Sequence, residues 1–231
     1  MAKKKKNKKN QAQEPFSPKK YIKERVRSLT IGDCYKPADF DKNGEGIFVI
    51  SRKHTGGKVS FACFLVDKWC TGVKDTYCKL RMEETDYEEY LERFSEHCEP
   101  CTYEEAHNWI YGAIEFAKGA GIPPHKDFMY TKYFLEEDTD DIPLIEYEYG
   151  YKGKYHLVCQ TQLEASYYLS FMKKNLSEDE YYYTFGMDEY DDDFDFDFDE
   201  SDDESDDDDF DDYDEVEEEV EEEAEDEEDK K

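Results

Sequence analysis

The feature that most limits how this chain can fold is the segregation of its charge. Residues 178–231 hold 34 acidic residues and two lysines, so this segment alone has a net charge of −32. Like charges at that density cannot collapse into a core, and the sequence predicts an acidic, disordered tail over 178–231. Residues 31–177 contain the apolar side chains that can bury a core, and their number suits one globular domain.

The N-terminal segment 1–30 has the opposite charge, with 11 lysines and arginines against two acids. Ser17 followed by Pro18 is a typical helix start, because the hydroxyl caps free N–H groups and proline suits the first turn. We expect a basic arm with a short helix that ends near Ser28. Its cations suit a polyanion such as RNA, the ribosome or DNA. The residues predicted to make this contact are Lys3, Lys4, Lys5, Lys6, Lys8, Lys9, Lys19, Lys20, Arg25 and Arg27.

The acidic tail suits the opposite kind of partner, a basic protein. Because tail and arm belong to one chain, their mutual effective concentration can be about millimolar, and the tail is expected to screen the arm. The alternative is that both ends only keep the protein soluble.

Neither a secretory signal nor a membrane span is evident, and the seven cysteines are an odd number. We therefore expect a cytoplasmic protein with reduced thiols and no membrane contact.

The domain itself is predicted to be α+β. Three runs rich in β-branched and aromatic residues, 46–52, 59–67 and 73–80, predict an antiparallel three-strand meander, and Gly56–Gly57 provides its first turn. The alternation of Leu144–Tyr149 and the run Tyr155–Cys159 predict a later hairpin.

Helical spacing of apolar residues predicts three to four helices. They cover 85–97, 102–119, 126–135 and a closing segment that includes 163–172. The second begins with a capping box, in which Thr102 and Glu105 satisfy each other's backbone N–H groups. Strands followed by helices and a hairpin predict a mainly antiparallel sheet with its helices on one face. The sequence leaves parallel crossovers open as the alternative, above all for the second hairpin.

Three stretches, Leu65–Asp75, Glu105–Ile114 and Pro124–Phe128, carry the motifs LVDxWCxGVKD, EAHNxIYGAI and PHKDF. Together they resemble an uncharacterised bacterial domain family. The resemblance covers most of the domain and neither charged end. It implies a recurring bacterial domain and nothing about its chemistry.

Two cysteines at C-x-x-C spacing, Cys98 and Cys101, are a candidate metal site with His97 or His107 as a further ligand. Thiolates at this spacing can bind one zinc ion, which would make the domain a zinc-stabilised binding module. However, a second paired set of ligands is not evident, and the motif also matches a redox pair or a loop between two helices.

An acid/base cluster is the second candidate. Asp67, Lys74 and Asp75 flank a turn after a strand, and His107 and His125 can approach it in space. Such groups can move protons or bind a metal for hydrolysis. The alternative is that the aspartates cap turns and that the lysine pairs with one of them.

Aromatic residues on or beside the strands are a third feature, since exposed rings can stack on single-stranded bases. Packing within the sheet is the favoured explanation, because strands favour aromatic residues on packing grounds alone, and the domain's net charge of −9 opposes a broad phosphate-binding face. These residues are Tyr35, Trp69, Tyr77, Tyr147 and Tyr149.

The leading interpretation is a non-enzymatic interaction protein, with a hydrolase and a zinc module as alternatives. The sequence leaves the ligand, the oligomeric state and the strand order open.

Overall fold

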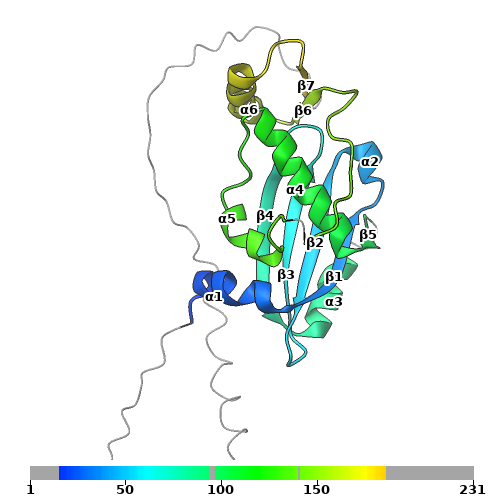
Figure 1. The fold of residues 1–231 in the computed structure, drawn as a ribbon, viewed down its shortest axis with the longest axis vertical. Coiled ribbons are helices and arrows are strands. Elements are labelled where there is room, and N and C mark those ends of the chain that lie inside the picture. The colour runs from blue at the N-terminus through cyan, green and yellow to red at the C-terminus, as the bar shows by residue number, and fades with distance from the viewer. Residues whose placement is uncertain (1–15, 94–96, 140, 186–231) are drawn as a thin grey trace, which may run out of the picture. The chain divides into compact units, whose positions relative to one another are not determined.

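A computed structural model describes residues 16–93, 97–139 and 141–185 of the chain (Figure 1). The predicted α+β class is confirmed. The helices and turns of 3-10 helix are α1 (Pro18–Arg25), η1 (Val26–Ser28), α2 (Phe40–Asn43), α3 (Glu84–Glu92), α4 (Tyr103–Gly119), α5 (Phe128–Thr131), η2 (Lys132–Phe134) and α6 (Gln162–Asn175). The strands are β1 (Thr30–Pro37), β2 (Glu45–Lys53), β3 (Val59–Asp67), β4 (Gly72–Met82), β5 (Cys98–Cys101), β6 (Tyr155–Cys159) and β7 (Tyr181–Phe185).

The main sheet has five strands in the order β4-β3-β2-β1-β5, and all neighbours are antiparallel. The predicted meander β2-β3-β4 is confirmed. Its first turn closes with Lys53 opposite Val59, and Gly57 has a φ of 86°, which a residue with a side chain rarely adopts. Strand β1 adds to the other side of β2 and carries the short edge strand β5.

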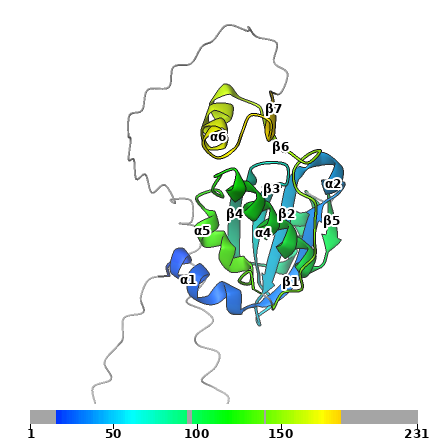
Figure 2. The same ribbon diagram turned by 45° about the horizontal axis from the view of Figure 1, so that its top comes forward.

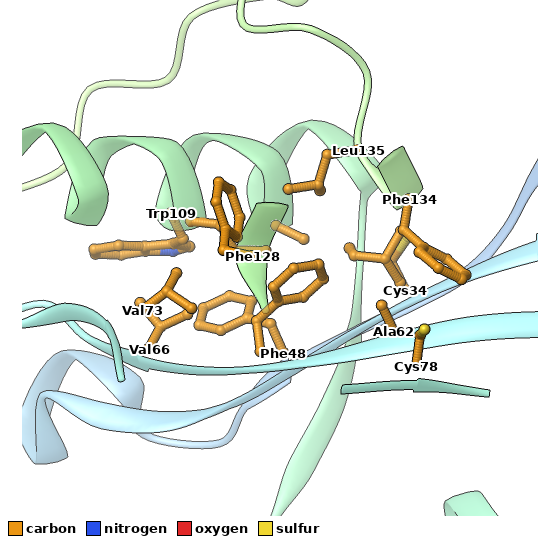
Figure 3. Close-up of a cluster of buried hydrophobic side chains, with 14 of the residues drawn as sticks. Cys34, Phe48, Ala62, Val66, Val73, Cys78, Trp109, Phe128, Phe134 and Leu135 are labelled. Atoms are coloured by element: carbon orange, nitrogen blue, oxygen red, sulfur yellow. The ribbon is translucent and has the colours of Figure 1, made fainter. Parts of the chain in front are cut away.

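Helix α4 covers one face of this sheet (Figures 1 and 2). The predicted capping box of Thr102 and Glu105 is present at its start. Its apolar side, which includes Trp109 and Ile110, packs on strand residues such as Phe48 and Phe64. Figure 3 shows how α5 and the following turn add Phe128, Phe134 and Leu135 to this core.

Helix α3 lies on the opposite face, so the prediction that all helices share one face is wrong. Its Tyr87 is buried with Val49, Phe61 and Cys63. Residues of opposite parity on the same strands face α4, because successive side chains of a strand alternate between faces. Helix α3 ends at Glu92, before the predicted 97, and residues 94–96 lie outside the described ones.

The predicted later hairpin is also wrong. Strand β6 pairs with β7 in parallel, and α6 is the crossover between them. Parallel strands need such a crossover, whereas a hairpin needs only a turn. The described structure thus continues to Phe185, eight residues into the segment 178–231 that the sequence predicted as tail. Residues 186–231 lie outside the described ones.

The segment Leu144–Tyr149, predicted as the hairpin's first strand, has no strand partner. Instead it runs along α4. The backbone N–H of Ile145 donates to Asn108 Oδ1 at 3.0 Å, and the ring of Tyr147 stacks on Trp109 with centroids 3.7 Å apart. The alternating pattern therefore reflects packing against a helix and not pairing in a sheet.

Candidate nucleic-acid interface

Helix α1 joins the basic arm to the folded body. The Ser17 side chain accepts a hydrogen bond from the Lys20 backbone N–H at 3.4 Å, as its place before proline predicts. On the inner side of this segment, Ile22 and Val26 are fully buried in the main core. The helix is thus held against the body by its apolar side.

The polar side of α1 carries the cations. The ammonium groups of Lys19 and Lys23 lie 5.4 and 5.0 Å from the centre of the Tyr130 ring, within cation–π range. Arg25, in the last turn, is exposed. Of the other residues predicted for this interface, Lys3, Lys4, Lys5, Lys6, Lys8 and Lys9 lie outside the described residues.

Arg27 is used inside the protein. Its guanidinium donates to the carbonyl oxygens of Leu135 and Lys132 at 2.9 and 3.3 Å and pairs with Glu137 at 2.7 Å. These bonds leave it little capacity to bind an outside phosphate. Its function is to join the base of the arm to the turn after α5.

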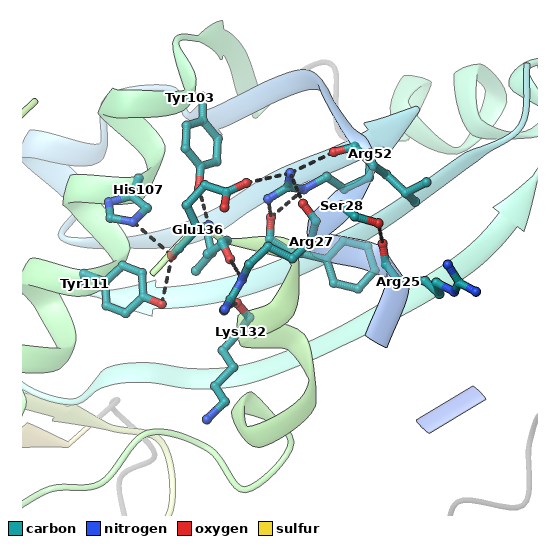
Figure 4. Close-up of polar contacts among 12 residues, drawn as sticks. Arg25, Arg27, Ser28, Arg52, Tyr103, His107, Tyr111, Lys132 and Glu136 are labelled. Carbon is teal, nitrogen blue, oxygen red and sulfur yellow. Dashed lines mark hydrogen bonds and ion pairs between the residues drawn. The ribbon is translucent and has the colours of Figure 1, made fainter. Parts of the chain in front are cut away.

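Arg52 completes this junction, and its role was not predicted from the sequence. It is 1% exposed. Its guanidinium donates twice to the Phe134 carbonyl, at 2.9 and 2.7 Å, and also reaches the carbonyls of Arg27 and Leu29 and the carboxylate of Glu136 (Figure 4). The only sequence signal was an arginine directly after the apolar run of β2. These bonds hold η1, which follows helix α1, on the folded body.

The acid/base candidates do not form one cluster. Asp67 is buried, and its carboxylate accepts hydrogen bonds from the backbone N–H groups of Trp69, Cys70 and Thr71 and from the Thr71 hydroxyl. Burial raises the pKa of Asp67, while these four donors favour the ionised form. The residue caps the β3–β4 turn.

Lys74 and Asp75 point to different partners. Lys74 pairs with Glu45 at 2.9 Å and with Glu164 of α6 at 3.1 Å. Asp75 lies 3.8 Å from His125, a contact between two partly exposed side chains. That pair is the one part of the predicted cluster that the fold brings together.

His107 lies elsewhere, buried on α4. Its Nε2 is 3.3 Å from the Glu136 carbonyl oxygen, which the Tyr111 hydroxyl also approaches (Figure 4). Burial lowers the pKa of His107. The imidazole thus helps to hold the same turn that Arg52 binds.

The two cysteines of the C-x-x-C motif occupy an edge strand, not the interhelical loop considered from the sequence. Cys98 approaches the Ile47 carbonyl oxygen on the α3 face, whereas Cys101 packs against the core under α4. Residues three apart in a strand point to opposite faces, so these two thiols do not converge on one metal ion. His97 is exposed, and no group of three metal-binding side chains occurs among the described residues.

Two hollows lie on the α3 side of the sheet, with volumes of about 460 and 540 Å³. Neither is lined by Asp67, Lys74, Asp75, His107 or His125. The candidate acid/base residues therefore do not surround either of these cavities.

The aromatic residues singled out from the sequence mostly pack internally. Trp69 stacks on His156, and Tyr149 donates its hydroxyl to the Asn108 carbonyl at 2.9 Å. Tyr77 is 38% exposed, and its hydroxyl contacts that of Tyr90. The remaining ones are Tyr147, which stacks on Trp109, and Tyr35, which lines the smaller hollow.

None of the described helices is both long and apolar enough to cross a membrane. Comparison of the chain with protein-family models, with curated proteins and with solved structures gave no match. The resemblance to a bacterial domain family thus has no support beyond the three motifs, and a function has to be inferred from the side chains themselves.

Proposed function

We propose that this chain is a non-enzymatic interaction protein whose basic arm and helix α1 contact the phosphates of RNA, the ribosome or DNA. The acidic tail competes with that contact and can hold a basic protein in its place. We further propose that the protein acts in the cytoplasm, where its seven free cysteines would stay reduced.

The observation that carries this proposal is how helix α1 is held against the folded body. Its apolar side is buried, and its base is bound by Arg27 and Arg52. Its cations Lys20, Lys23 and Arg25 are exposed. Six further lysines precede it in the sequence. A fixed cationic helix that continues a lysine-rich segment is suited to follow a polyanion backbone.

The tail is argued from charge and tethering. It carries most of the chain's negative charge and belongs to the same molecule as the arm, so arm and tail meet at an effective concentration of about millimolar. Outside polyanions then have to displace the tail. Binding is expected to be weak and strongly dependent on salt.

The alternatives have less support. A hydrolase would need its acid and base groups together, and here Asp75 and His125 meet while Asp67 and His107 serve separate turns. A zinc module would need converging thiols, which Cys98 and Cys101 do not provide.

The test compares the full chain with a variant that ends after Asp188. This end point keeps β7, whereas a deletion from 178 would remove it and expose β6. Binding of a fluorescein-labelled oligo(U) RNA is measured by fluorescence anisotropy at about 50 and 200 mM salt. We expect the shortened chain to bind more tightly, and the difference to shrink as salt rises. If the full chain and the shortened chain bind with equal affinity at both salt concentrations, the proposed competition by the tail is refuted.

A matched pair of triple variants tests the surface. Three lysines of α1 are replaced by glutamine in one variant and three exposed lysines elsewhere in the other. We expect the first to lose affinity and to show a smaller salt dependence, and the second to bind as the parent does. The positions are Lys19, Lys20 and Lys23 in the first variant, and Lys118, Lys173 and Lys174 in the second.

A further inference from the structure

A chain of polar contacts links helix α1 to the β2–β3 hairpin. The Tyr21 hydroxyl lies 3.4 Å from His54 Nδ1, and the two rings are nearly parallel, with centroids 6.4 Å apart. On its other side, His54 Nε2 lies 2.8 Å from the hydroxyl of Ser60, which is fully buried. The same hydroxyl accepts a hydrogen bond from the Arg81 backbone N–H at 2.9 Å.

Arg81 occupies an unusual backbone conformation. Its φ is 52°, in the left-handed region that residues with side chains rarely adopt. The pairing of β3 with β4 shifts there by one residue, since Val59 lies opposite Met82 but Phe61 lies opposite Lys79. A bulge of this kind re-aims a side chain out of the regular sheet, and such strained positions often occur at functional sites.

The bulge brings the Arg81 charge to the Tyr21–His54 pair. Burial lowers the pKa of His54, and the positive charges of Arg81 and Lys58 lower it further. Burial raises the pKa of the Tyr21 hydroxyl, while the positive charges of Arg81 and of Arg25, one helical turn along α1, oppose this rise. Charges from the helix, the hairpin and β4 thus meet at one place.

The two arginines at this place differ from the other two near the arm. Arg27 and Arg52 are bound to carbonyls and carboxylates, whereas Arg25 and Arg81 form no ion pair with any described residue. Lys58 pairs with Glu83 at 3.1 Å. Two guanidinium groups therefore remain available to an outside anion.

We propose that Arg25 and Arg81, beside the Tyr21–His54 pair, form a subsite for a backbone phosphate of nucleic acid that is bound along the arm. This inference rests on the function proposed above and extends the contact from the arm onto the folded body. Arginine suits the task because its planar fork can donate two hydrogen bonds to one phosphate. Partly exposed rings beside it suit the bases or sugars of a single strand.

The subsite also makes binding depend on pH through His54. A bound phosphate favours the imidazolium over the imidazole and raises the pKa of His54. By linkage, nucleic acid then binds more tightly as the pH falls through the pKa of this histidine. The charged and titratable groups around His54 are Tyr21 on α1, Lys58 with its partner Glu83, and Arg81 on β4. Arg25 on α1 acts on the Tyr21 hydroxyl beside it.

The experiment uses the full chain with Arg81→Gln and, as the control, Arg93→Gln. Both changes remove one positive charge, and Arg93 follows the far end of α3 from Arg81. Anisotropy with labelled oligo(U) at several salt concentrations gives the affinity and its salt slope. We expect Arg81→Gln to weaken binding about fivefold at low salt and to reduce the slope by about one, and Arg93→Gln to leave both unchanged.

A second measurement follows the His54 ring by NMR during a pH titration, with and without the RNA. The pKa of His54 should rise on binding in the parent protein and stay unchanged in Arg81→Gln. Inorganic phosphate serves as a further probe. If it raises the pKa while RNA does not, the subsite takes free anions and the assignment to nucleic acid is overturned.

Failure of the proposed function and failure of the phosphate subsite give different results. If the parent chain and the chain that ends after Asp188 both fail to bind RNA at low salt, the proposed function is lost, and this inference with it. If the parent binds but Arg81→Gln and Arg93→Gln behave alike, the subsite alone is refuted. If Arg81→Gln melts at a lower temperature than the parent chain, the variant Arg81→Lys, which keeps the positive charge, separates the effect of the charge from that of stability. Binding by Arg81→Lys must then exceed binding by Arg81→Gln.

Discussion

Arg52 offers the sharpest test of how the arm is held, through the substitution Arg52→Leu. The guanidinium is fully buried and donates to the carbonyls of Phe134, Arg27 and Leu29 and to the Glu136 carboxylate. Leucine fills part of the volume but donates no hydrogen bond. The change therefore leaves three carbonyls without this donor at the junction of β2, η1 and η2.

The expected cost follows from the kind of interaction lost. Breaking one side of a buried, hydrogen-bonded ion pair costs about 3–5 kcal/mol. Orphaned carbonyls cost about 1–3 kcal/mol each, but they share one site and water can enter, so their costs do not add in full. We expect a loss of about 3–5 kcal/mol in the free energy of unfolding. For a body of this size, that corresponds to a fall of roughly 6–20 °C in Tm.

Urea unfolding monitored by tryptophan fluorescence measures this loss, with Lys118→Ala as the control. Lys118 and its partner Glu115 are both more than two thirds exposed, so their ion pair should contribute less than about 0.5 kcal/mol. Amide hydrogen exchange should also speed up in α1 and η1. A loss below about 1 kcal/mol for Arg52→Leu, or unchanged exchange there, would refute the view that this network holds the arm.

Three further outcomes are expected. Thr102→Ala should lower the free energy of unfolding by about 1 kcal/mol, while Thr102→Ser should nearly restore it, because the hydroxyl caps α4; chemical denaturation of both variants checks this. Burial lowers the pKa of His107 in the folded protein. The stability that this histidine contributes should therefore be fully present above the ordinary histidine pKa of about 6.5 and decline as the pH falls from there toward the lowered pKa. His107→Gln should flatten that part of a curve of Tm against pH. Cys98 and Cys101 should react first with a thiol reagent in mass-spectrometric mapping, because they are half-buried and the other five cysteines are buried. A chelator should leave Tm unchanged, because these two thiols face opposite sides of β5 and do not bind one metal ion together.

Local signals in the sequence were sufficient for a large part of the fold. The capping box of Thr102 and Glu105 fixed the start of α4, and the Gly56–Gly57 turn fixed the meander. Ser17 marked the start of α1. Each of these depends on residues within a few positions of one another, so the pattern and its partner are both visible in one stretch of sequence.

The candidate site was only partly accessible in this way. The cations of α1 follow from the sequence, but Arg27 was assigned to the interface and is bound inside instead. Neither the burial of Arg52 nor the position of Arg81 beside Ser60 and His54 could be predicted. Both depend on segments that lie far away in sequence and come together only in the folded chain.

The sequence by itself determined the charge layout, the α+β class and the elements whose signals are local. The tertiary structure decided which partner each element found. Leu144–Tyr149 alternates like a strand but packs along α4, and β7, in a segment predicted to be tail, pairs with β6. Cys98 and Cys101 are close in sequence yet point to opposite faces of a sheet. The physical reason is that periodicity shows which side of a segment is apolar, whereas only long-range packing selects the surface against which that side is buried.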